Sequence, residues 1–106
     1  MKDGAEARRR TNLKRLLAPR HIAFVGGRAI EGCVNATRKS GFTGKIWAVH
    51  PKYTELAGVA CVPSLADLSE PPDAALIAVS RELTVDVVAE LSAMGAGGAV
   101  SIVGEF

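Results

Sequence analysis

The sequence predicts an α/β protein with an open parallel sheet of about five strands and helices on both faces. Short, continuously apolar runs are typical of parallel strands that are buried on both sides. Such runs occur at residues 22–25, 46–49, 74–79 and 99–103, with a weaker one at residues 59–62. Segments of helical periodicity lie between them, which predicts βαβ units with right-handed crossovers. A length of 106 residues suits one domain.

The charge of the chain divides near its amino-terminal end. Residues 1–20 contain seven basic and two acidic residues, whereas residues 21–106 contain six basic and nine acidic ones. We expect residues 1–12 to form a basic, flexible arm and residues 13–106 to form the domain. Such an arm can contact nucleic acid or an acidic partner. No aromatic residue interrupts the arginine run, however, and this favours a solvated terminus without a nucleic-acid partner.

The expected helices lie between polar caps and helix-breaking residues. They are placed at residues 11–18, 30–40 and 83–94, with one helical turn at residues 64–68. Thr11 or Asn12 caps the first helix, which ends before Pro19, and Ser64 caps the turn. The first helix is expected to carry Leu13, Leu16 and Leu17 on one face. The last is expected to turn Leu83, Val87, Val88 and Leu91 inward.

The residues at the carboxyl ends of the strands are the candidates for a site, because open α/β sheets bind ligands there. The first such loop contains Gly26, Gly27 and Arg28. Glycine lets the backbone approach a phosphate, and the start of the following helix favours an anion. A tight turn that needs glycine only for steric reasons explains these residues equally well.

The loop after the second strand carries a cation where nucleotide-binding folds of the NAD type carry an acid. Val49 is followed by His50, Pro51 and Lys52, and no acidic residue occurs before Glu55. A lysine at this position favours a phosphorylated ribose, as in NADP or the 3′-phosphate of coenzyme A. The alternative is a solvated lysine after a rigid proline turn. His50, which precedes a proline, is expected to be a turn residue.

Ser80 follows the strand at residues 74–79, and Val79 ends that strand. The Ser80 hydroxyl can bind a ligand, but a cap for the next helix is the favoured interpretation. The sequence contains no Ser-His-Asp spacing, paired carboxylates or metal cluster, so neither catalytic nor metal-binding residues are predicted. Cys33 and Cys61 fit no disulfide framework and are expected to be reduced. No apolar run approaches the length of a membrane span, and a cytoplasmic protein is expected.

Three stretches of the chain, in order, resemble the coenzyme A-binding domain of NDP-forming acyl-CoA synthetases. They are residues 16–26 (LLAPRHIAFVG), residues 41–52 (GFTGKIWAVHPK) and residues 63–79, which include SLADL and PPDAALIAV. The second stretch is similar to that family's Gly-Phe-x-Gly-x-Ile-x-x-Val-x-Pro-Lys pattern. The family is related to the α subunit of succinyl-CoA ligase, and the resemblance extends over residues 13–106.

The resemblance implies a Rossmann-like domain with the nucleotide end of coenzyme A across the carboxyl ends of the strands. Carried over by position, the ligand would contact Gly26, Gly27, Arg28, Val49, Pro51, Lys52, Val79 and Ser80. The family's phosphorylated histidine and ATP-grasp module belong to other domains, so this chain alone is not expected to catalyse a reaction. The expected partners are coenzyme A or acyl-CoA, and downstream ligase domains in cis or in trans.

The first loop departs from the family pattern. Gly27 and Arg28 replace the usual Ala-Ser, and residues 33–36 lack a second glycine. These differences put the phosphate contact of this loop in question. Two other functions therefore stay open: an NAD(P)-binding domain of an oxidoreductase or redox sensor, and an interaction module with a degenerate pocket.

Overall fold

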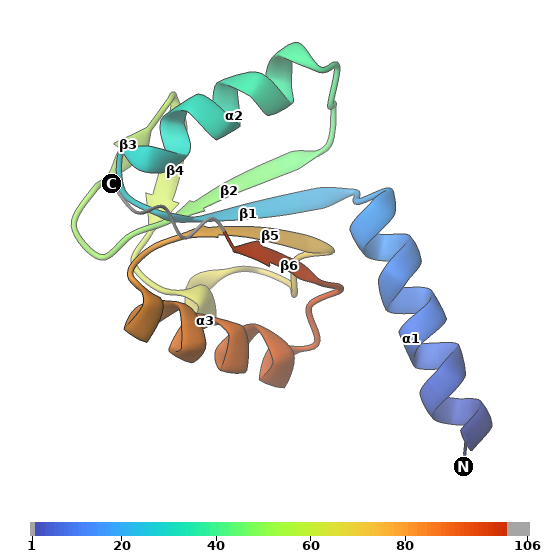
Figure 1. Ribbon diagram of the computed structural model, residues 1–106. Coiled ribbons are helices and arrows are strands. Elements are labelled where there is room, and N and C mark those ends of the chain that lie inside the picture. The colour runs from blue at the N-terminus through green and yellow to red at the C-terminus, as the bar shows by residue number, and fades with distance from the viewer. Residues whose placement is uncertain (1, 102–106) are drawn as a thin grey trace.

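A six-stranded sheet forms the centre of the computed structural model, which describes residues 2–101 (Figure 1). Its strand order is β3-β4-β2-β1-β5-β6. The strands are β1 (His21–Gly26), β2 (Lys45–Val49), β3 (Glu55–Leu56), β4 (Val59–Val62), β5 (Ala74–Ala78) and β6 (Ala99–Ser101). Every neighbouring pair is parallel except β3 and β4. The predicted open parallel sheet is thus confirmed.

Helices cover both faces of this sheet, as predicted (Figure 1). Helix α2 (Ala29–Lys39) lies on one face, and α3 (Arg81–Met94) and the short 3-10 helix η1 (Leu65–Asp67) lie on the other. Successive residues of β1 face opposite sides of the sheet. Phe24 packs with Ile30 and Val34 of α2, and Val25 packs with Leu91 of α3. This alternation follows from the two-residue period of a strand.

The strand that the sequence did not predict is β3. It is only two residues long and pairs antiparallel with β4. The connecting turn has positive φ at Ala57 (52°) and Gly58 (77°), which is typical of a tight hairpin. The Arg38 guanidinium of α2 donates a hydrogen bond of 2.6 Å to the Ala57 carbonyl oxygen. A tertiary contact thus supports a turn whose sequence lacks the usual asparagine–glycine signal.

Helix α1 (Lys2–Leu17) begins at Lys2, so it is longer than the helix expected at residues 11–18, and the expectation that residues 2–10 have no regular structure is wrong. Twelve of its sixteen residues are Arg, Lys, Ala, Glu or Leu, which favour helix even without an apolar face. The helix projects away from the sheet (Figure 1). Only Leu16 of the three predicted leucines is partly buried; Leu13 and Leu17 are exposed. The division between arm and domain at residue 12 stays a prediction.

Two of the four side chains predicted to be inward on α3 are exposed. Leu91 is buried and Val87 partly buried, but Leu83 and Val88 are exposed. Helix α3 packs against β1 and β5 through Val87, Leu91 and Met94. Leu83, in its first turn, faces the open space at the carboxyl ends of the strands instead. Of the predicted last strand, residues 102 and 103 lie outside the described range.

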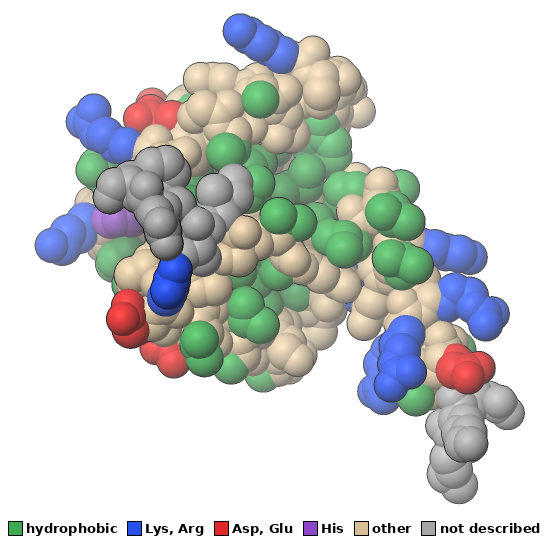
Figure 2. All heavy atoms as spheres, viewed as in Figure 1, with side chains coloured by type: hydrophobic (Ala, Val, Ile, Leu, Met, Phe, Trp, Pro, Cys, Tyr) green, Lys and Arg blue, Asp and Glu red, His purple; other side chains and the backbone are tan. Residues whose placement is uncertain are grey.

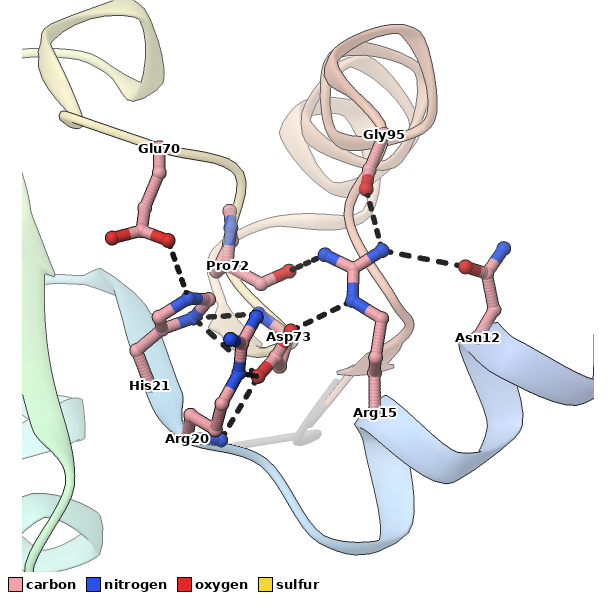
Figure 3. Close-up of polar contacts among 8 residues, drawn as sticks. All are labelled: Asn12, Arg15, Arg20, His21, Glu70, Pro72, Asp73 and Gly95. Carbon is pink, nitrogen blue, oxygen red and sulfur yellow. Dashed lines mark hydrogen bonds and ion pairs between the residues drawn. The ribbon is translucent and has the colours of Figure 1, made fainter. Parts of the chain in front are cut away.

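A buried carboxylate, Asp73, joins α1 to the amino-terminal edge of the sheet (Figure 3). Its Oδ1 accepts a hydrogen bond of 2.7 Å from Nε of Arg15 in α1. Its Oδ2 accepts from the backbone amide of Arg20 at 2.9 Å and from the Arg20 Nε at 3.2 Å. The Asp73 amide donates to Nδ1 of His21, and the other ring nitrogen of His21 lies 2.9 Å from Oε1 of Glu70.

The hydrogen bonds of this network determine the ionisation of Asp73. Burial by itself would raise the pKa of the carboxyl, but the hydrogen bonds from Arg15 and Arg20 outweigh burial and hold the pKa below its ordinary value. Arg15 also donates to the Gly95 carbonyl oxygen at 2.9 Å, which links α1 to the end of α3. The charged form of Asp73 therefore connects α1, β1, β5 and α3.

We expect Asp73→Asn to lower the free energy of unfolding by about 1–3 kcal/mol, the usual cost of disrupting a buried hydrogen-bond partner. Because the folded-state pKa is depressed, this stabilisation is present above the ordinary aspartate pKa and is lost as the pH falls toward the folded-state value. The difference between the parent and the variant should therefore narrow below about pH 4. Urea denaturation followed by circular dichroism at several pH values measures it.

The matched control is Glu55→Gln, which neutralises an exposed carboxylate on β3. Its free energy of unfolding should stay within about 0.5 kcal/mol of the parent. A loss in Asp73→Asn that is no larger than in this control, or that is the same at every pH, would contradict the role assigned to Asp73.

Candidate functional site

A cleft of about 300 Å³ opens at the carboxyl ends of β1, β2 and β5, on the side of the sheet that α3 covers. Its lining is mainly apolar and comes from several elements. The lining residues are Val25, Gly26, Val49, His50, Pro51, Pro63, Ser64, Leu65, Val79, Leu83, Val87 and Glu90. The chain runs from β1 to β2 on one side and returns to β5 on the other. A crevice at such a reversal is the usual ligand site of an open α/β sheet.

The glycine turn after β1 is shaped by a close approach of two strands. Gly26 has φ of 150°, and a Cβ atom there would lie 2.6 Å from the Ala78 carbonyl oxygen of β5. Only glycine fits this position. At Gly27 a Cβ would lie in ordinary contact, 3.6 Å from Nε2 of His50. The second glycine is therefore not required by sterics, and it leaves open space beside the His50 ring.

Helix α2 begins directly after this turn, with Arg28 at the N-cap position. The amide of Ile30 donates a hydrogen bond of 3.0 Å to the Gly27 carbonyl oxygen. The amide of Glu31 donates one of 3.0 Å to the Arg28 carbonyl oxygen. The helix start, with its partial positive charge, thus lies at the carboxyl edge of the sheet. No side chain caps it. An anion can take the place of a cap at such a helix start.

The loop after β2 is held by His50, which is the turn residue that the sequence predicts. Its Nδ1 accepts hydrogen bonds from the backbone amides of Lys52 (3.0 Å) and Tyr53 (3.2 Å). The ring also lies against Tyr53, with 4.5 Å between the ring centroids. An Nδ1 that accepts two hydrogen bonds carries no proton, so the ring proton is on Nε2. His50 therefore presents an N–H donor beside Gly27.

Both signs of charge occur at this edge, where Glu31 and Glu82 lie in the first turns of α2 and α3. Arg28 and Lys52 are exposed, and no carboxylate among residues 2–101 forms an ion pair with either. Glu55, the first acidic residue after β2, does not line the cleft, and Glu90 is the one carboxylate in the lining. Within the described residues no three His, Cys, Asp or Glu side chains are placed to bind a metal.

The predicted site residues divide into three groups. Gly26, Val49, Pro51 and Val79 line the cleft. Gly27, Arg28 and Lys52 lie on the two loops at its mouth, but are not part of its lining. Ser80 caps α3, and its Oγ accepts a hydrogen bond of 3.4 Å from the Leu83 amide. This geometry corresponds to the favoured cap interpretation. Contact of any of these residues with a ligand stays a prediction.

The sequence did not predict that residues around η1 and on α3 line the cleft. The residues concerned are Pro63, Ser64, Leu65, Leu83, Val87 and Glu90. Ser64 and Asp67 form a reciprocal capping box at η1. The serine followed three residues later by an acidic residue is the sequence pattern that could have predicted the position of η1. No local sequence pattern predicts that Leu83, Val87 and Glu90 of α3 line the cleft, because this depends on how the helix crosses β5.

Comparison with protein families identifies one match, to the family model described as CoA binding domain, over residues 20–106. Among curated proteins, ADP-forming acetate–CoA ligase I of Archaeoglobus fulgidus is 36% identical over 93 residues. The ADP-forming acetate–CoA ligase of Methanocaldococcus jannaschii is 35% identical over 97 residues. These alignments cover 85% and 89% of this chain but only 14% of each relative, so the chain spans a small part of their length.

A solved structure has the same fold. Dinucleotide-forming acetyl-coenzyme A synthetase 1 of Ca. Korarchaeum cryptofilum, in its apo form, superposes with a TM-score of 0.77 at 29% sequence identity. The superposition covers 89% of this chain and 22% of that one. No helix among the described residues combines the length and apolarity that a membrane span requires.

We expect the two glycines of the first loop to respond differently to alanine. Gly26→Ala should lower the free energy of unfolding by about 1–3 kcal/mol, because its Cβ meets a backbone oxygen and its φ is unfavourable. Gly27→Ala should change it by less than about 0.5 kcal/mol. Denaturant titration of the two variants tests this pair. Equal losses would show that the contact between β1 and β5 does not constrain Gly26.

Proposed function

The chain belongs to the CoA binding domain family, and from this premise we propose that its cleft holds the nucleotide end of coenzyme A. The observation that carries the proposal is an apolar cleft with two exposed cations, Arg28 and Lys52, on the loops at its mouth. Coenzyme A has the matching division, since it combines a flat adenine with three phosphate groups. An apolar cavity with a few placed polar groups is the usual form of such sites.

The adenine fits best between the valines of the cleft. Val25 and Val49 lie in β1 and β2, Val79 directly follows β5, and all three line the cleft together with Leu83 and Val87 of α3. A planar base placed there would bury both of its faces against apolar side chains. His50 and Ser64 supply polar groups at its edge. Glu90 supplies a carboxylate that can accept a hydrogen bond from the adenine amino group.

The phosphates fit the two loops at the mouth. The start of α2, with Gly27 and Arg28, offers backbone approach and positive charge to the pyrophosphate. The neutral His50 ring offers an Nε2–H donor at the same place. Lys52 is assigned to the 3′-phosphate, because it follows β2 at the position where an NAD site would need a carboxylate. Arg28, at the N-cap, supplies a charge that the usual alanine–serine pair does not.

The two other functions make different demands on the same residues. An NAD site requires an acceptor for the free ribose hydroxyls, and the loop after β2 provides a cation instead. An NADP site tolerates that cation, so binding measurements must include NADP. A degenerate interaction module requires no open cleft, whereas the cleft here is open. Arg28 and Lys52 at its mouth form no ion pair among residues 2–101.

The wider function follows from the relatives and is likewise our proposal. We infer that the domain serves an acid–CoA ligase of the NDP-forming type, in which coenzyme A is a substrate. The nucleotide-dependent step would then take place on other ligase domains, joined to this chain in cis or bound to it in trans. Cys33 and Cys61 are free thiols, which supports a reducing compartment such as the cytoplasm.

The first prediction from this assignment concerns ligand choice. Isothermal titration of the purified chain should show tighter binding of coenzyme A than of NAD, because the loop directly after β2 offers Lys52 to a 3′-phosphate and no carboxylate to a ribose diol. NADP is included in the same series. Tighter binding of NADP would favour the oxidoreductase interpretation, equal or tighter binding of NAD would contradict the charge argument, and no binding of any of the three would favour the interaction module.

The second prediction concerns Lys52. We expect Lys52→Ala to weaken coenzyme A binding by several-fold up to about tenfold, the latter equal to about 1.4 kcal/mol. The loss should shrink for dephospho-coenzyme A, which lacks the 3′-phosphate, and at high salt. The unfolding transition should hardly change, because the side chain is exposed.

The control for this variant is Lys39→Ala, which removes an exposed lysine from the last turn of α2, at the opposite edge of the sheet. It should bind both ligands as the parent does. If Lys52→Ala also binds both as the parent does, Lys52 is only a surface lysine, and the 3′-phosphate must be bound elsewhere.

A further inference from the structure

His21, the first residue of β1, is a buried histidine whose two ring nitrogens are both hydrogen-bonded. Its Nδ1 accepts a hydrogen bond of 2.9 Å from the Asp73 amide, and its Nε2 lies 2.9 Å from Oε1 of Glu70 (Figure 3). A nitrogen that accepts from an amide carries no proton, so the ring proton is on Nε2 and is donated to Glu70. This hydrogen-bond pattern requires the neutral ring.

A second hydrogen-bond pattern is within reach of the protonated ring. Oδ2 of Asp73 lies 3.9 Å from Nδ1 of His21. A proton on Nδ1 makes that nitrogen a donor, so it gives up the Asp73 amide and can donate to Oδ2 after a small movement. Each N–H of the charged ring then has a carboxylate as acceptor, Glu70 on one side and Asp73 on the other. Carboxylates this close favour the charged form of a histidine.

The two patterns differ in the acceptor that is left for Arg20. With the neutral ring, Oδ2 of Asp73 accepts from the Arg20 amide at 2.9 Å and from the Arg20 Nε at 3.2 Å. Arg20 belongs to the short connection, residues 18–20, between α1 and β1. A charged His21 competes with Arg20 for this oxygen. The hold of the sheet on the connection to α1 therefore depends on the charge of the ring.

We propose that His21 is a pH-sensitive switch that loosens the attachment of α1 when its ring is protonated. Histidine is the side chain that ordinarily changes its charge between about pH 5 and pH 8. Asp73 stays ionised over this range, because its hydrogen bonds hold the pKa of the carboxyl below the ordinary value. The proposal is independent of the coenzyme A assignment, since His21 lies at the edge of the sheet opposite to the cleft.

Cations near this network oppose protonation of the ring but do not bind it. Arg15 and Arg20 form ion pairs with Asp73, and the Lys45 Nζ lies 5.2 Å from the ring centroid of Trp47. Among residues 2–101 none of these three cations forms a hydrogen bond or ion pair with the imidazole. The groups that bind its nitrogens are the two acidic residues, and the Asp73 amide is the one group there that disfavours a proton on Nδ1.

Trp47 is placed to report the charge of the ring. It is the single tryptophan of the chain, and its ring centroid lies 5.0 Å from that of His21. A protonated imidazole in contact with an indole quenches its fluorescence more strongly than a neutral one. The other histidine, His50, packs against Tyr53 at the opposite edge of the sheet. The emission of Trp47 therefore follows His21.

A fluorescence titration from pH 8 to pH 5 tests whether the ring takes up a proton. The emission of the parent chain should fall with the pH in a single transition. The fall should be absent in His21→Asn, whose side-chain oxygen can accept from the Asp73 amide but does not titrate. Glu70→Gln replaces a half-exposed side chain and should fold normally. Its transition should lie at lower pH, because a carboxylate that favours the charged ring is gone.

Two results of this titration would overturn the proposal. One is a constant emission of the parent chain across the range. The other is an identical transition in the parent and in Glu70→Gln, which would show that the titrating group is not bound to this carboxylate. Because Glu70→Gln does not alter the buried ring, this second comparison holds even if His21→Asn fails to fold.

Nuclear magnetic resonance of the ¹⁵N-labelled chain tests the link to α1. As the pH falls, the amide resonances of Arg20 and Asp73 should shift with the same midpoint as the Trp47 emission, because both amides lose their acceptors. Relaxation of the ¹⁵N nuclei should show more motion in α1 and residues 18–20 at pH 5 than at pH 8, with no change in α2. If the ring titrates while Arg20 and α1 keep the same order at both pH values, protonation does not loosen the attachment and the proposal is wrong.

Discussion

The main chains of β1 and β5 approach so closely at Gly26 that a side chain there would meet the Ala78 carbonyl oxygen. This contact joins the two halves of the sheet, β2 to β4 on one side of β1 and β5 to β6 on the other. With β1 and β5 joined, α2 and α3 must leave on opposite faces, and a crevice opens between the strand ends. The position of the cleft is thus a result of backbone packing before any ligand is considered.

Polar groups are distributed unequally between the two edges of the sheet. At the amino-terminal edge Arg15 and Arg20 both form ion pairs with the single carboxylate of Asp73 (Figure 3). At the carboxyl edge Arg28 and Lys52 have no such partner among the described residues. The ion pairs that join α1 to the sheet and the cations that we propose bind phosphate therefore lie at opposite ends of the same strands. A substitution at one end should leave the role of the other intact.

Strong local patterns predicted most of the fold, and weaker or non-local ones did not. The apolar runs of β1, β2 and β5 and the cap at Ser64 were recognisable because each is defined by a few neighbouring residues. The strand β3 and the exposed side of α3 depend on distant contacts, as with Arg38 at the hairpin turn. In the site, the strand ends were predictable from topology. The α3 wall was not, because the helix crossing determines it.

The two amides that bind Nδ1 of His50 impose a direction on hydrogen bonding at the mouth of the cleft. The ring can offer only a donor toward Gly27, since a lone pair on Nε2 would require the proton to sit where those amides point. In the proposed coenzyme A site, a phosphate oxygen or another acceptor would therefore be favoured beside Gly27 over an amine. Selection of this kind depends on the orientation of two main-chain amides and not on the net charge of the loop.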